Sequence, residues 1–239
     1  MTGLGTIINV AAIVAGGLLG MLFGKAMKQR HQQTLTAVCG IATLFIGITG
    51  ALEGMLSVDG GAVVSGKGLF LVVCLALGGL IGEIINIEAG FERFGNWLKQ
   101  KTGNARDPQF VGGFVTASLT VCIGAMAIVG ALQDGLQGDY SVLATKAVLD
   151  LIIIMVMTCS LGKGCIFSAI PVALLQGSIT AMAKLIQPVM TQPALDNLSM
   201  IGSVLIFCVG VNLVWDRKLR VANLLPAVVL AVIAAFLPV

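Results

Sequence analysis

Unbroken apolar runs of about 20 residues constrain the fold of this chain more than any other feature. A helix of that length crosses the hydrocarbon core of a bilayer, where only helices and closed barrels satisfy all backbone hydrogen bonds. A barrel would need alternating strands of about ten residues, which these runs lack. The sequence predicts about eight transmembrane helices, near residues 6–23, 35–56, 68–87, 110–132, 144–161, 165–187, 198–215 and 221–237.

The amino-acid composition is typical of a protein embedded in a membrane. Hydrophobic residues make up 57% of the 239 residues and charged residues 10%, against roughly 25% charged residues in soluble domains. No loop is long enough for a soluble domain, so we predict one transmembrane domain over residues 1–239, an all-α polytopic integral membrane helical bundle. The formal net charge of +3 does not indicate nucleic acid binding, because the basic residues lie in short loops between apolar runs.

Basic residues are sorted to alternate loops, which predicts the topology. Eleven of them follow the first, third, fifth and seventh runs, whereas the opposite loops contain only Lys67. Because loops rich in lysine and arginine remain in the cytoplasm, both termini are predicted to be extracytoplasmic. The eleven are Lys25, Lys28, Arg30, Arg93, Lys99, Lys101, Arg106, Lys163, Arg217, Lys218 and Arg220.

The two early hairpins resemble each other in sequence. The GG-x-x-G run at residues 16–20 recurs at residues 78–82, and part of the second span matches the fourth at a constant offset of 80 residues. We predict parallel repeats at about 5–56 and 68–132, followed by a second half at 144–239; chance similarity of apolar sequence is the alternative. The GxxxG spacings favour close helix packing, either within the chain or between copies in a homo-oligomer.

Between the third and fourth spans, Ile87, Phe91, Phe94 and Leu98 recur at helical spacing, with charged residues on the other face. This pattern predicts an amphipathic helix on the inner leaflet. A cytoplasmic extension of the third span is the alternative.

Charges inside a span are the strongest functional candidates, since one at a helix centre costs roughly 2.5–3.5 kcal/mol. Lys146 and Asp150 lie four residues apart in the fifth span, so they share a helix face and can pair as ions. We predict that both turn towards the bundle interior and line a path for a solute or proton. The alternative is that Lys146 extends to the interface and Asp150 caps a neighbouring helix.

Three further candidates lie near the ends of predicted spans. Gln133 and Asp134 stand in a glycine-rich stretch that predicts a turn, either an external loop or one folded back into the membrane. Glu83 lies within one turn of the cytoplasmic interface. It is predicted to be either a buried relay group or an interfacial carboxylate satisfied by water.

The sixth span contains the candidates Ser168, Gln176 and Lys184, together with Pro171 and Gly177. Proline removes a backbone donor and glycine loosens the next turn, so this helix is predicted to be kinked or discontinuous. Freed carbonyl groups of broken helices coordinate ions and substrates in many transporters. A membrane proline without such a role is the alternative.

Neither an enzyme nor a metal site is indicated. The six cysteines lack CxxC spacing, and the single histidine, His31, lies in a basic loop. The sequence contains no nucleotide-binding motif and no Ser/Lys pair identified by its spacing. We expect no catalytic residue, no metal, no cofactor and no ATP-driven step.

Several segments together resemble those of a bacterial membrane family. They are Gly5 to Asn9, the two GG-x-x-G runs, Gly138-Asp139 with Lys146 and Leu149-Asp150, Cys159 to Gly162, and Val221 to Pro226. Over nearly the whole chain this pattern is similar to the bacterial domain of unknown function 554 family, the YqgA/YdfK-like membrane proteins. The resemblance implies a protein of the bacterial inner membrane and supplies no catalytic residues. Lys163 departs from the pattern, because a neutral residue is expected there.

We predict that the chain transports a small solute or ion by a passive or ion-coupled route. The alternative is a non-transporting scaffold or accessory subunit, whose glycine faces bind partners. A polar cavity at mid-membrane would favour transport, and a solid apolar interior would favour a scaffold. In both cases the lipid bilayer is the immediate partner of the chain.

Overall fold

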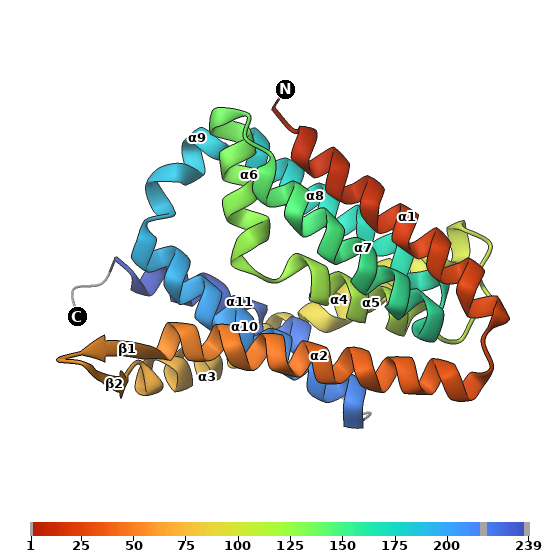
Figure 1. Cartoon of the computed structure of the whole chain (residues 1–239), viewed down its shortest axis with the longest axis horizontal. Helices are drawn as coiled ribbons and strands as arrows, with labels where there is room; N and C mark the ends of the chain where they lie inside the picture. Colours follow the sequence, from red (N-terminus) through yellow and green to blue (C-terminus); the bar gives the residue numbers. More distant parts are fainter. Residues whose placement is uncertain (1, 216–218, 237–239) are drawn as a thin grey trace.

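The computed structural model describes residues 2–215 and 219–236, most of them helical (Figure 1). The long apolar helices are α1 (Leu4–Ala26), α2 (Gln29–Met55), α3 (Gly68–Ile85), α7 (Ser141–Leu161) and α10 (Gln192–Trp215). A sixth apolar run consists of the 3-10 helix η1 (Lys163–Ser168) and α8 (Ala169–Ala181). These six are long and apolar enough to cross a membrane, so the predicted all-α polytopic class is confirmed.

The predicted fourth span is interrupted. Its residues form two helices, α5 (Phe110–Cys122) and α6 (Ala125–Gln137), which are bent by 61° relative to each other. At the break Gly124 has a φ of 140°, a conformation that residues with a Cβ rarely adopt. The prediction of one continuous helix over residues 110–132 is therefore wrong.

The predicted eighth span is short. It comprises η3 (Val221–Leu224) and α11 (Leu225–Ala234), fewer than the roughly 20 residues of a full crossing. Its predicted end, Leu237, lies outside the described residues. The described residues contain six long apolar helices, or seven if α5 and α6 form one span, against about eight predicted.

The connections contain structure that the sequence did not predict. After α2 the chain forms an antiparallel hairpin of β1 (Leu56–Asp59) and β2 (Ala62–Ser65), closed by Gly60 and Gly61. Both glycines have positive φ, which a tight hairpin turn requires. On the way from α8 to α10 the chain forms α9 (Ala183–Ile186) and η2 (Gln187–Val189).

The predicted amphipathic segment forms a separate helix, α4 (Ile87–Lys101). Asn86, with a φ of 57°, separates it from α3, so α4 is not a continuation of that span. Phe94 packs edge-on against Phe114 of α5, with ring centroids 5.8 Å apart, and Leu98 is buried. The apolar face of α4 therefore packs partly on α5, and its position on the inner leaflet stays a prediction.

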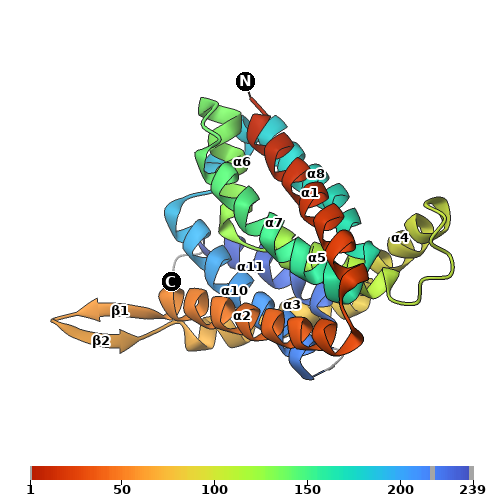
Figure 2. The same ribbon diagram turned by 45° about the vertical axis from the view of Figure 1, so that its right-hand side comes forward.

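Glycines set the closest helix contacts within the chain. α1 packs against α7, and α3 packs against η3 and α11 (Figures 1 and 2). A Cβ added at Gly16 or Gly20 would meet the backbone of α7, and one added at Gly78 or Gly82 would meet that of α11 or η3. The predicted GxxxG signals therefore serve packing within the chain, and a homo-oligomer stays a prediction.

The internal repeat also stays a prediction. α1 and α2 diverge after their turn (Figures 1 and 2), and α2 is continuous where the matching part of α5 and α6 is broken. In the second half, α8 and α11 each follow a 3-10 helix and carry a proline, Pro171 or Pro226, in their first turn. First-turn N–H groups have no partner within the helix, so proline is tolerated there. The break predicted at Pro171 and Gly177 does not occur, because α8 continues through both residues to Ala181; a kink there stays a prediction.

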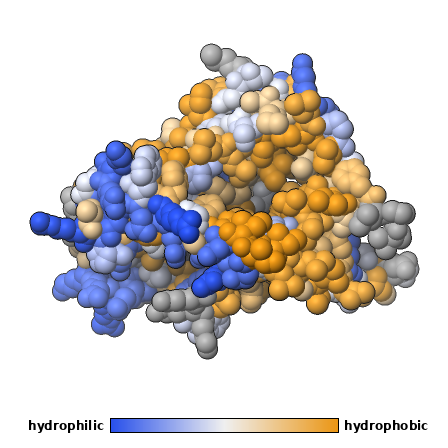
Figure 3. All heavy atoms as spheres, turned by 180° about the vertical axis from the view of Figure 1, so that it is seen from behind, coloured by the Kyte–Doolittle hydropathy of each residue, from blue (hydrophilic) through white to orange (hydrophobic). Residues whose placement is uncertain are grey.

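The connections gather at two ends of the molecule, as the sorting of basic residues predicts. The α1–α2, α4–α5 and α7–η1 connections meet around one hollow, lined by Gln32, Asp107 and Lys163 among others; we call this end the basic end. At the opposite end, Lys67 donates a 3.1 Å hydrogen bond to Asn197 Oδ1. Hydrophilic residues gather mostly at one end of the surface in Figure 3, beside a broad apolar area. Which end faces the cytoplasm stays a prediction, and Arg217 and Lys218 lie outside the described residues.

Candidate functional site

A buried ion pair lies between the helices. Lys146 and Asp150 are one turn apart on α7, and the Nζ–Oδ2 distance is 2.6 Å. Their side chains are 10% and 4% exposed, so both turn into the bundle, as predicted. Neither alternative geometry occurs, because Lys146 does not extend to the interface and Asp150 does not cap a helix. Their role in transport stays a prediction.

Two amides from other helices continue this polar region. Asn9 of α1 lies beside Asp150 and donates from Nδ2 to Oε1 of Gln176 on α8 at 3.3 Å. An amide group between a carboxylate and a carbonyl oxygen must present its N–H atoms to both, which fixes its orientation. Asp150 therefore orients Asn9, and Asn9 orients Gln176.

This chain of contacts leaves hydrogen-bonding atoms unused. Asn9 Oδ1, Gln176 Nε2 and the hydroxyl of Thr6, one turn before Asn9, are buried and have no hydrogen-bond partner among the described residues. Each such atom costs about 1–3 kcal/mol, so native proteins rarely keep several together without a ligand or water. We call Thr6, Asn9, Lys146, Asp150 and Gln176 the polar cluster.

A hollow of about 540 Å³ leads from the N-terminal end of α1 to this cluster. Thr6 from α1, Gly135 from α6 and Gly177 from α8, the residue after Gln176, all line it. We call it the N-terminal hollow. Its remaining lining residues are Thr2, Gly3, Ile7, Thr180 and Ala181.

Asp134 lies within a helix, not in a loop, and its carboxylate holds the start of α1 beside the N-terminal hollow. It lies within α6, is fully buried, and accepts hydrogen bonds from the backbone N–H groups of Gly3 (3.1 Å) and Gly5 (3.0 Å). A carboxylate at the first turn of α1 satisfies unpaired N–H groups and opposes the positive end of the helix dipole. The predicted turn around Gln133 and Asp134 is wrong, because α6 continues to Gln137 and the chain turns at Gly138.

An apolar plug separates the polar cluster from the basic end. Ile13 of α1 and Ile154 and Met157 of α7 are almost completely buried in one hydrophobic cluster, beyond Asp150 along α7. Past them, buried Thr158 lines a second hollow of about 320 Å³ that opens at the basic end. The break between α5 and α6 lies beside the ion pair, since Cys122, the last residue of α5, is close to both charged groups.

The other candidates lie apart from the polar cluster. Ser168 is buried, but its hydroxyl donates to the carbonyl of Cys165 at 2.7 Å. Lys184 is exposed on the short helix α9, so it does not lie within a span as predicted. Gln133 is half-buried on α6, and its Oε1 has no partner among the described residues. Within residues 2–215 and 219–236, no three His, Cys, Asp or Glu side chains lie close enough together to bind a metal ion.

Sequence reasoning named neither Thr6 nor Asn9 as a candidate site residue. Both belong to the face of α1 that continues to Ile13, at helical spacings of three and four residues. That spacing was visible in the sequence. The partner of this face, Gln176, comes from a helix that lies 167 residues further on, which no local pattern indicates.

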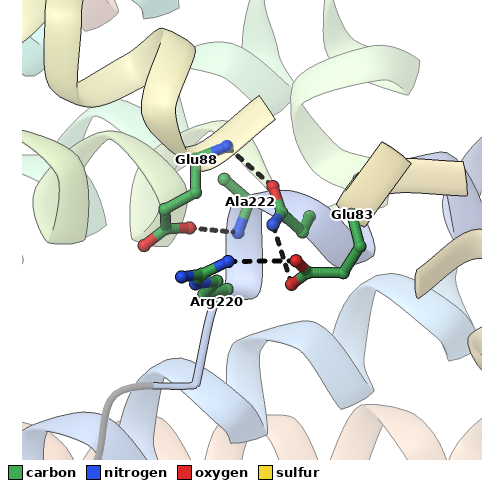
Figure 4. Close-up of polar contacts among 5 residues, drawn as sticks. Glu83, Glu88, Arg220 and Ala222 are labelled. Carbon is green, nitrogen blue, oxygen red and sulfur yellow. Dashed lines mark hydrogen bonds and ion pairs between the residues drawn. The ribbon is translucent and has the colours of Figure 1, made fainter. Parts of the chain in front are cut away.

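Glu83 belongs to a second polar group, near the start of α4 (Figure 4). It accepts hydrogen bonds from Asn223 Nδ2 at 2.9 Å and from Arg220 at 3.0 Å. The side chains of Glu83 and Arg220 are 50% and 60% exposed, so water screens their attraction and the pair contributes little to stability. Glu83 is therefore not a buried relay group, and its position at the membrane interface stays a prediction.

Two hydrogen bonds of Glu88 connect the start of α4 to η3 (Figure 4). The Glu88 N–H donates to Asn223 Oδ1 at 2.7 Å, and Glu88 Oε2 accepts from the Ala222 N–H at 2.9 Å. Burial raises the pKa of the Glu88 carboxyl, although the Ala222 N–H opposes this rise. The fold therefore disfavours the charged form of Glu88.

Replacing Glu88 with glutamine should leave the protein equally or slightly more stable at pH 8, by less than about 1 kcal/mol. Glutamine keeps an acceptor for Ala222 and removes the charge that the fold disfavours. This difference should shrink as the pH falls towards 4.5, the ordinary pKa of the side chain, because Glu88 itself becomes neutral there. Thermal unfolding in detergent at several pH values measures it, with exposed Glu92→Gln as the control. A variant that loses stability mainly above neutral pH would contradict the assignment.

Comparison with known proteins adds the family context. A family model described as "Protein of unknown function (DUF554)" matches residues 4–236. The chain is 30% identical over 232 residues to "Uncharacterized membrane protein YdfK" of Bacillus subtilis, covering 97% of this chain and 95% of the relative. It is 30% identical over 233 residues to "Uncharacterized protein YqgA" of Escherichia coli, covering 95% of this chain and 94% of the relative. No solved structure matches the chain.

Proposed function

Because the chain belongs to the DUF554 family of unknown function and is a multi-pass membrane protein, we propose that it carries a small polar solute or ion across the bilayer. The unpartnered atoms of the polar cluster support this proposal most strongly. A passing solute that both donates and accepts hydrogen bonds can pair with Thr6, with Asn9 Oδ1 and with Gln176 Nε2. Passage is passive or ion-coupled, since the sequence carries no nucleotide-binding motif.

The arrangement of hollows suggests how passage is controlled. The N-terminal hollow admits a solute as far as Thr6, and the plug of Ile13, Ile154 and Met157 closes the way to the hollow at the basic end. Transport requires this plug to open while the first hollow closes. The break at Gly124 gives α5 and α6 a point at which they can move separately, as interrupted helices do in transporters.

The unpartnered atoms also weigh against a purely structural role. A scaffold gains nothing from buried hydroxyl and amide groups without partners, and apolar side chains of the same shape would be more stable there. The glycine faces that a scaffold would offer to partners are occupied by helices of the same chain. We propose no enzymatic activity, since the polar cluster contains no nucleophile paired with a base.

The variant Thr6→Val tests whether the chain is a transporter or a scaffold. Valine has the same shape and lacks the unpartnered hydroxyl, so stability should rise by about 1 kcal/mol. If Thr6 contacts the solute, flux into proteoliposomes should fall several-fold in this more stable variant. The assay is uptake from a panel of radiolabelled cations and amino acids.

Thr43→Val is the matched control, because buried Thr43 donates its hydroxyl to Cys39 O at 2.8 Å on α2 and lies outside the polar cluster. This change should leave flux unchanged. Parent-level flux in Thr6→Val would remove Thr6 from the path. An absence of uptake of every panel member by the parent protein would favour the scaffold.

Cysteine labelling tests the orientation. A reagent that cannot cross the membrane should label cysteines placed at exposed Asp139 or Gln192 and not at Gln100 or Leu219, in intact cells. Gly135 is unsuitable as an outer position, because its Cβ would lie 2.5 Å from the Thr180 carbonyl oxygen. The parent protein, whose six cysteines are buried or half-buried, gives the background. Labelling from the opposite side would reverse the predicted topology.

A further inference from the structure

Two hollows outside the polar cluster meet at Phe91 and Pro171. The first, of about 310 Å³, is lined almost entirely by apolar residues of α5, α6, α8, α10 and α11 and borders the break at Gly124. The second, of about 580 Å³, opens to the surface beside α4 and is lined by Arg93. We call them the apolar chamber and the Arg93 groove.

The apolar chamber is lined by residues from both ends of the molecule. Phe91 at one end belongs to α4, near the basic end, whereas Leu198 and Gly202 belong to the first half of α10, which begins at the opposite end. A Cβ added at Gly90 or Gly124 would meet nothing within 4 Å, so neither the groove nor the break is filled by protein there. An apolar hollow of this kind leaves its lining without contacts on one side.

The Arg93 groove, unlike the apolar chamber, carries a positive charge at its edge. Arg93 is exposed and forms no ion pair with any carboxylate in residues 2–215 and 219–236. Trp97, which stacks on Phe94 with centroids 5.8 Å apart, is 52% exposed next to it. An unpaired arginine beside an exposed tryptophan is typical of the interface where phospholipid head groups lie.

We propose that these two adjoining hollows bind one anionic phospholipid, with its phosphate at Arg93 and one acyl chain in the apolar chamber. The positive charge of Arg93 attracts the anionic head group, and the apolar lining of the chamber accommodates the acyl chain. Among its lining side chains only Ser118 offers a hydroxyl, so a peptide or polar solute would leave most of its hydrogen-bonding groups unpaired there. The site contains no residue of the polar cluster, although it borders the break at Gly124.

Native mass spectrometry of the full chain in detergent tests this proposal with two probes, phosphatidylglycerol and phosphatidylcholine. The parent should retain one phosphatidylglycerol and bind phosphatidylcholine more weakly. Arg93→Gln should weaken phosphatidylglycerol binding by about fivefold, the equivalent of ~1 kcal/mol for one basic group at a membrane surface. Arg106→Gln, an exposed arginine outside the groove, should leave it unchanged.

Gly202→Leu tests the chamber, because Gly202 lines it and the added Cβ would be 3.4 Å from Ile123 Cγ2, an ordinary contact. This variant should lose both lipids, while its unfolding temperature without added lipid reports whether it folds. If it does not fold, Val228→Phe fills the chamber from α11 instead. Three outcomes would each overturn the proposal. The parent could bind both lipids equally, Arg93→Gln and Arg106→Gln could lose the same affinity for phosphatidylglycerol, or a folded chamber-filling variant could retain lipid.

Discussion

Replacing Asp150 with asparagine should lower the free energy of unfolding by about 3–5 kcal/mol, one of the largest losses available to a single polar change in this chain. The substitution leaves the Lys146 ammonium group buried without its carboxylate, 2.6 Å away in the parent. A neutral amide cannot offset the ammonium charge as the carboxylate does, so much of the desolvation cost remains uncompensated. Lys146→Met should cost a similar amount, because it leaves the carboxylate alone.

The double variant Lys146→Met/Asp150→Leu should be more stable than either single variant. Removing both charges removes the desolvation cost with the attraction, which is often neutral or stabilising for buried pairs. Membrane abundance and thermal unfolding in detergent measure the four proteins, and Asp139→Asn serves as an exposed control. If the double variant folds like the parent and loses flux, the pair acts in transport. Single variants as stable as the parent would show that the charges are not held together in the bundle.

The geometry of this pair was predictable because it is local. Lys146 and Asp150 lie on one helix, and the spacing of four residues alone places them together. The long helices were predictable for a similar reason, since each apolar run must form its own backbone hydrogen bonds in lipid. Helix contacts through Gly16 and Gly82 followed the GxxxG pattern, although the pattern did not name the partner helix.

The remaining errors concern groups whose partners are distant in sequence. Glycines around Asp134 indicated a turn, but its carboxylate binds the start of α1, about 130 residues earlier, and α6 therefore continues through it. The break at Gly124 gave no distinct signal, because glycine occurs 31 times in the chain, mostly where helices pack closely. The convergence of Asn9, Asp150 and Gln176 depends on how α1, α7 and α8 pack.

The second large effect concerns the contact that brings α1 to the polar cluster. In Gly16→Leu, the new side chain should separate α1 from α7, because even its Cβ would overlap the backbone carbonyl group of Leu151. A backbone carbonyl in a helix cannot move aside as a side chain can, so the cost should reach about 3 kcal/mol or more. Asn9 lies two turns earlier on α1, and its contacts with Asp150 and Gln176 should be lost with the packing.

Gly112→Leu is the matched control, since Gly112 lies within α5 and a Cβ there would meet nothing within 4 Å. Replacing a glycine at such a helix position stabilises the folded state by up to about 1 kcal/mol. Membrane abundance and unfolding temperature should therefore fall sharply for Gly16→Leu and stay level or rise for Gly112→Leu. Gly16→Ala should lie between them, because α1 can shift slightly to accept a single methyl group. If Gly16→Leu matches the parent in both measurements, α1 does not pack on α7 at Gly16, and the face of α1 that carries Thr6 and Asn9 loses its support.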